Sequence, residues 1–85
     1  QLPQMSTTRR EELIKMLGKK AEECRIGVRS IRKDAQNQLK AAEKDSEISE
    51  DFAKRLADGL QKVTDNTIKI VDEIADKKAA DIRII

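Results

Sequence analysis

The sequence predicts an all-α protein, a long antiparallel helical hairpin that is part of a three-helix bundle. Three observations predict this class. Apolar residues recur every three or four positions over two long segments, which is the period of one face of an α-helix. Only 1% of the residues are aromatic, whereas sheets favour aromatic and β-branched residues. A short polar turn, residues 44–49, separates the two segments and makes them antiparallel neighbours.

The first predicted helix covers residues 7–44, roughly 57 Å at 1.5 Å per residue. Ser6 is its best N-cap, because the hydroxyl can accept a hydrogen bond from an N–H group of the first turn. Glu11 and Glu12 favour the first turns through the helix dipole. The predicted buried stripe consists of Leu13, Leu17, Ala21, Cys24, Val28, Ile31, Ala35, Leu39 and Ala42.

The second predicted helix covers residues 50–82, with Ser49 as its N-cap. Its apolar stripe is wide, about 160° of arc, whereas a helix that packs on one partner needs a narrower stripe. The stripe contains Phe52, Leu56, Leu60, Val63, Ile68, Ile70, Val71, Ile74, Ala75 and Ile82. We therefore expect residues 1–85 to form a single helical domain that is an incomplete bundle. Self-association is expected where no third helix covers the stripe.

Charge is distributed unevenly along the chain. Residues 1–44 contain 11 Lys and Arg against 6 Asp and Glu, a net charge of +5. Residues 45–85 contain 7 against 10, a net charge of −3. A basic half of this kind fits one face for a polyanion. No apolar run approaches the roughly 18 residues that a membrane span needs, so we expect no membrane partner.

Arg25, Arg29 and Arg32 recur at intervals of four and three and form a second stripe, very roughly 90° from the apolar one. Guanidinium groups suit phosphate, and Lys33 and Gln36 lie beside them. The stripe has no aromatic residue on which an unpaired base could stack, which argues against binding of single strands. RNA backbone is therefore one candidate partner of this stripe. The alternative is a solvated helix face whose arginines pair with acids one turn away.

Four segments resemble the ribosome recycling factor family. Residues 28–35, VRSIRKDA, look like the family's V-R-N-[IV]-R-R-D-A signature. Residues 2–10, 44–51 and 61–65 also follow the family's order and spacing. The resemblance covers nearly the whole chain but only the C-terminal part of such a factor. The family's N-terminal helix and the small β-rich domain inserted after it have no counterpart in these 85 residues.

The resemblance implies a non-enzymatic protein that binds the post-termination ribosome and splits its subunits together with elongation factor G. It implies a location in the bacterial cytoplasm, or in an organelle stroma or matrix. Residues matching Arg10, Arg29 and Arg32 meet large-subunit rRNA in the family, whereas Arg25 is expected from spacing alone. Lys33 replaces a common family arginine and keeps only the charge. The predicted rRNA-binding residues are Arg10, Arg25, Arg29, Arg32, Lys33 and Gln36.

The residue types argue against catalysis and metal binding. The chain has no His and a single Cys, so Cys24 has no partner to activate it and is expected to be a small buried residue. A zinc site would need His or a second Cys. There is no Gly-rich phosphate loop and no sign of a converging carboxylate pair. We therefore expect no catalytic residue, cofactor or metal. The alternative function is a structural hairpin module that self-associates into a helical bundle.

Overall fold

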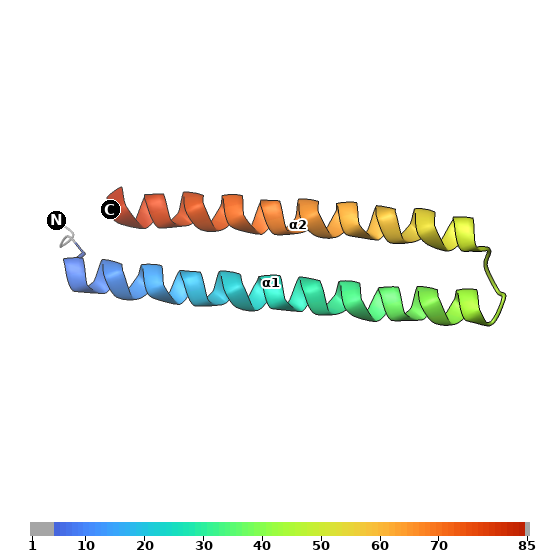
Figure 1. The fold of residues 1–85 in the computed structure, drawn as a ribbon. Coiled ribbons are helices and arrows are strands. Elements are labelled where there is room, and N and C mark those ends of the chain that lie inside the picture. Colours follow the sequence, from blue (N-terminus) through green and yellow to red (C-terminus); the bar gives the residue numbers. More distant parts are fainter. Residues whose placement is uncertain (1–4, 85) are drawn as a thin grey trace.

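The computed structural model describes residues 5–84 and consists of two long helices joined by a short turn (Figure 1). α1 spans Thr7–Lys44 and α2 spans Glu50–Ile84, against predicted bounds of 7–44 and 50–82. The helices run antiparallel over their whole length, so the start of α1 lies beside the end of α2 (Figure 1). The molecule is a rod of 67 × 15 × 15 Å. The predicted all-α helical hairpin is confirmed.

Serine side chains cap both helices at their N-termini. The Oγ of Ser6 accepts a hydrogen bond from the backbone N–H of Arg9 at 3.1 Å. The Oγ of Ser49 accepts one from the N–H of Phe52, also at 3.1 Å. Each hydroxyl satisfies an N–H group that has no partner within its own helix. Both helices therefore begin at the positions that the sequence predicts.

The C-terminus of α1 closes with a left-handed residue. Ser46 has a φ of 60°, and its N–H donates to the carbonyl of Glu43 at 3.0 Å. The N–H of Glu47 donates to the carbonyl of Ala42 at 2.9 Å. This pair of bonds is a Schellman motif, which satisfies two of the last carbonyls of the helix. Glycine is the residue usually found at the left-handed position, because it has no Cβ to clash there.

Small side chains form the contact between the helices. Ala21, Ala53 and Thr64 are the buried residues of the described chain, and small residues let two helix backbones approach closely. The Oγ1 of Thr64 donates to the carbonyl of Leu60 at 2.8 Å, so this hydroxyl is satisfied within α2. No large side chain between residues 5 and 84 is fully buried. The hairpin therefore has only a thin apolar core.

One long face of the hairpin is both apolar and exposed. Val28, Ile31, Leu60 and Val63 line one groove between the helices, and the α2 positions 52, 56, 63, 70 and 74 share one helical stripe. We call the exposed residues on this side the apolar face: Ile31, Phe52, Leu56, Val63, Ile70 and Ile74. Exposed apolar surfaces of this kind mark sites of interaction. The wide stripe of the second helix predicts this exposure.

The predicted burial of Cys24 and Ile31 is wrong for the hairpin. Cys24 is exposed, and the side chain of Ile31 is 70% exposed. At 100° per residue, Ile31 lies about 60° to one side of Val28 on α1, whereas Arg32 lies about 40° to the other side. α2 covers the side of Arg32, which is half-buried, and leaves the side of Ile31 open.

We expect Ser46→Gly to stabilise the hairpin by about 0.5–1 kcal/mol, because glycine adopts the left-handed conformation without a Cβ clash. Thermal melting followed by circular dichroism measures the change. Ser30→Gly is the matched control, because Ser30 lies inside α1 and glycine there should destabilise. A lower melting temperature for Ser46→Gly would contradict the role given to this turn.

We expect the melting temperature of the 85-residue chain to rise with protein concentration, since association would cover the apolar face. Burial of apolar surface contributes about 25 cal/mol per Å². Val63→Asp should weaken this dependence, whereas Ile26→Asp, at an exposed position outside the apolar face, should leave it in place. A melt that does not depend on concentration, together with a monomeric mass, would rule the expectation out.

Candidate RNA-binding face

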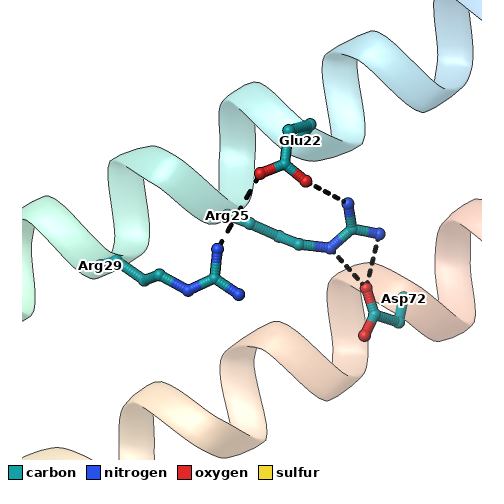
Figure 2. Close-up of polar contacts among 4 residues, drawn as sticks. All are labelled: Glu22, Arg25, Arg29 and Asp72. Atoms are coloured by element: carbon teal, nitrogen blue, oxygen red, sulfur yellow. Dashed lines mark hydrogen bonds and ion pairs between the residues drawn. The ribbon is translucent and has the colours of Figure 1, made fainter.

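Arg25 ties the two helices together (Figure 2). Its Nε and Nη2 both lie 2.7 Å from Oδ1 of Asp72 on α2, and its Nη1 lies 3.1 Å from Oε2 of Glu22. The hydrogen bond to Asp72 raises the pKa of Arg25, and the bond to Glu22 adds to this effect while desolvation opposes it. The stability from this shift is present below the ordinary pKa of arginine and is lost only at higher pH. Two carboxylates thus occupy all three nitrogens of this guanidinium.

Arg29 lies one turn further along α1 and is far less constrained. Its side chain is 49% exposed, and its Nη1 lies 3.9 Å from Oε1 of Glu22, the carboxylate that Arg25 also contacts (Figure 2). This separation is at the outer limit of an ion pair and too long for a hydrogen bond. An exposed pair of this kind contributes little and is easily exchanged for another anion. Arg29 is therefore available to a phosphate group.

Arg32 contacts a neutral side chain instead of a carboxylate. Its Nη1 donates to Oε1 of Gln61 on α2 at 3.2 Å, and Nε2 of Gln61 donates to Oδ1 of Asp65 at 2.9 Å. The Nε of Arg32 is buried and has no hydrogen-bond partner within residues 5–84. In the same part of the chain, no carboxylate forms an ion pair with Arg32. The guanidinium group of Arg32 is therefore positioned by a hydrogen bond and, among the described residues, is not paired with a negative charge.

The other three predicted residues lie at different distances from this group. Lys33 is exposed beside Arg32, and Gln36 is half-buried in a groove that α1 and α2 form near the turn. Arg10 is half-buried near the start of α1, and its Nε has no partner among the described residues. At 1.5 Å per residue, Arg10 lies about 22 Å from Arg25 along α1. Five of the predicted residues thus share one part of α1, and Arg10 stands apart.

Three residues of this face belong to α2 and were not among the predicted ones: Gln61, Asp65 and Asp72. A signal for them exists in the sequence. Arg25 and Arg32 are seven apart, and so are Asp65 and Asp72, so one antiparallel register brings both pairs level. The pattern is that of charged residues flanking the seam of a coiled coil.

The described residues contain neither a cluster of metal ligands nor a membrane-spanning helix. Between residues 5 and 84, no three His, Cys, Asp or Glu side chains lie close enough together to hold a metal ion. Neither helix combines the length and apolar character needed to cross a lipid bilayer.

Comparison with known proteins gives one consistent result. A family model described as ribosome recycling factor matches residues 1–82. The chain is 49% identical to the ribosome-recycling factor of Sulfurovum sp. (strain NBC37-1) over 80 residues, which is 94% of this chain and 43% of that protein. It is 48% identical to the factor of Carboxydothermus hydrogenoformans over 81 residues, 95% of this chain and 44% of that protein. The chain thus spans less than half the length of these curated relatives.

We expect Arg25→Ala and Asp72→Ala each to lower the melting temperature, and the double variant to melt no lower than Arg25→Ala, which also loses the contact to Glu22. The effects of substitutions at two residues in direct contact are not additive, because the contact is already lost in either single variant. Arg29→Ala, which removes only the long contact to Glu22, serves as the control and should melt almost like the unchanged chain. Melting temperatures that fall additively would show that Arg25 and Asp72 do not stabilise the hairpin as a pair.

Proposed function

Because the chain belongs to the ribosome recycling factor family, we propose that it acts in ribosome recycling, as the part of such a factor that binds large-subunit rRNA. The observation that carries the proposal is the uneven neutralisation of the arginine stripe. Arg25 is tied to two carboxylates, whereas Arg29 has one long contact to a carboxylate and Arg32 is held by a neutral amide. Both of these arginines fall in the segment that resembles the family signature.

The spacing of Arg29 and Arg32 suits an RNA strand. The two residues are three apart on α1, so their guanidinium groups lie on adjacent turns of one helix edge. Guanidinium binds phosphate oxygens through paired N–H donors, and two such groups can grip neighbouring phosphates. No aromatic side chain accompanies them on α1, so we propose recognition of RNA backbone and shape.

The remaining predicted residues support the proposal to different degrees. Lys33 is exposed next to Arg32 and can add a point charge, and Gln36 can add a hydrogen bond at the edge of the groove. Arg10 would contact a separate RNA segment, because of its distance along α1. Arg25 is the weakest member, since binding RNA would require it to leave Asp72.

The apolar face has a place in the same proposal. We propose that it packs against a third helix from the remainder of a longer factor, which completes the bundle that the family resemblance implies. The relatives are more than twice as long as the matched segment, which leaves sequence for such a helix. In this reading the chain is a non-enzymatic part of a factor that acts on the ribosome together with elongation factor G, in the bacterial cytoplasm or an organelle stroma or matrix.

The second candidate function is a structural module that self-associates into a helical bundle. The exposed apolar face is the observation that favours it. The two candidates differ in their prediction for cosedimentation with large ribosomal subunits over a range of salt concentrations. An RNA-binding chain should sediment with the subunits at low salt and be released as salt rises, because each neutralised phosphate releases counterions. A purely structural hairpin should stay in the supernatant throughout.

We expect Arg29→Ala and Arg32→Ala each to weaken binding to the large subunit by about 1–3 kcal/mol, because each removes a charge-assisted contact. The salt dependence of binding should become shallower, while helicity stays unchanged. Arg→Lys at either position should restore binding only in part, because Lys lacks the planar fork. Binding is measured with the 85-residue chain, and subunit splitting with a chimera in which residues 1–82 replace the matching segment of the Sulfurovum factor.

Lys15→Ala is the control, because it removes an exposed charge from α1 at a position outside the proposed face. Should Arg29→Ala and Arg32→Ala bind and split subunits like this control, the arginines are a solvated surface and the proposed function is wrong.

A further inference from the structure

Two arginine–aspartate positions in the hairpin are equivalent by register. Arg25 on α1 lies against Asp72 on α2. Moving seven residues forward on α1 reaches Arg32, and moving seven back on α2 reaches Asp65. Because the helices are antiparallel and rise equally per residue, the second pair lies level in the same way as the first. The same interhelical ion pair is therefore expected at both positions.

Only the first position forms the ion pair. The Nε and Nη2 of Arg25 contact Oδ1 of Asp72 directly at 2.7 Å. At the second position the amide of Gln61 lies between the two charges. Its Oε1 is 3.2 Å from Nη1 of Arg32, and its Nε2 is 2.9 Å from Oδ1 of Asp65. Within residues 5–84, Arg32 and Asp65 form no direct ion pair.

The two positions differ on both helices. On α1, Glu22 lies three before Arg25, whereas Arg29 lies three before Arg32.

The difference on α2 concerns the aspartates. Gln61 lies four before Asp65, and the corresponding residue four before Asp72 is Ile68. An amide can accept a hydrogen bond from a guanidinium and donate one to a carboxylate, whereas isoleucine can do neither. Arginine only donates and an ionised aspartate only accepts, so the orientation of the Gln61 amide is fixed by its two neighbours.

We propose that Gln61 is a positioning residue that keeps the charge of Arg32 available to an RNA phosphate by engaging the carboxylate of Asp65. The inference rests on the proposed function, because it assigns Arg32 the RNA contact. Gln61 holds Nη1 of Arg32 without adding a negative charge, and the recorded contacts leave Nη2 for a phosphate oxygen. Arg25, which has Ile68 in place of such an amide, pairs directly with Asp72 through Nε and Nη2.

Gln61→Ile tests the proposal, because it gives the second position the α2 residue that the first position has. Arg32 should then pair with Asp65, and affinity for large subunits should fall about tenfold, close to the loss in Arg32→Ala. The slope of log affinity against log salt should become shallower by about the amount that one phosphate contact contributes. The melting temperature should not fall, because the variant gains an interhelical ion pair.

Rescue separates this role from a simple packing role. Asp65→Asn removes the competing carboxylate, so the double variant Gln61→Ile with Asp65→Asn should recover most of the lost affinity and salt slope. Asn66→Ile is the matched control, since it also replaces an amide on α2 by isoleucine at an exposed position. It should bind like the unchanged chain. The variants are compared in the 85-residue chain and in the Sulfurovum chimera, with helicity checked by circular dichroism.

The outcomes separate the two proposals. If Arg32→Ala binds weakly but Gln61→Ile binds normally, Gln61 does not protect Arg32 and the proposed function stands. If Gln61→Ile binds weakly and Asp65→Asn does not rescue it, the positioning role of Gln61 is wrong, because Asp65 does not then compete with RNA phosphate for Arg32. If Arg32→Ala binds like the unchanged chain, the proposed function and this inference both fail.

Discussion

The structure depends on the narrow contact that two long helices can make with each other. Two cylinders touch along one line, and here that line is made of small residues such as Ala21, Ala53 and Thr64. Each helix therefore has two flanks beside the contact, and the sequence treats them differently. On one flank lie exposed apolar residues such as Ile31 and Val63, and on the other lies the ion pair of Arg25 with Asp72. The division of the surface into an apolar and a polar side follows from this geometry.

The polar side shows how neighbouring residues assign different tasks to the same residue type. Arg25, Arg29 and Arg32 have the same side chain and adjoining positions, but their partners differ in charge and distance. An arginine that contacts a carboxylate of the other helix directly holds the two helices together. A long contact or a neutral amide leaves the cation available. The proposed binding face is therefore defined as much by residues of α2 as by the arginines themselves.

The sequence predicts the fold well because the relevant signals are local. The serine caps, the period of the apolar residues and the short turn each depend on residues a few positions apart, and they locate both helices. Burial is harder to predict, because it depends on how many neighbours a helix has. Cys24 and Ile31 belong to an apolar stripe that two helices alone do not cover.

The polar contacts between the helices are the part that a pattern search on one helix misses. Asp72 lies 47 positions from Arg25, so its effect on that arginine depends on the interhelical register. In the linear sequence, nothing sets Gln61 apart from the other polar residues of α2. Its place between Arg32 and Asp65 in the fold is what gives it a proposed role. The spacing of seven on both helices is the sequence signal that connects these residues.

The same spacing of seven has a consequence for how the hairpin keeps its alignment. If α2 slid along α1 by one heptad, Arg32 would meet Asp72, so the charges alone would tolerate the sliding. The short turn opposes it, because residues 45–49 span the gap with the bonds from Ser46 and Glu47 already tied to the end of α1. A shifted pairing would have to unwind a helix end to supply the missing chain. The turn therefore fixes which arginine each aspartate can reach, from about 20 to 30 Å away along the helices.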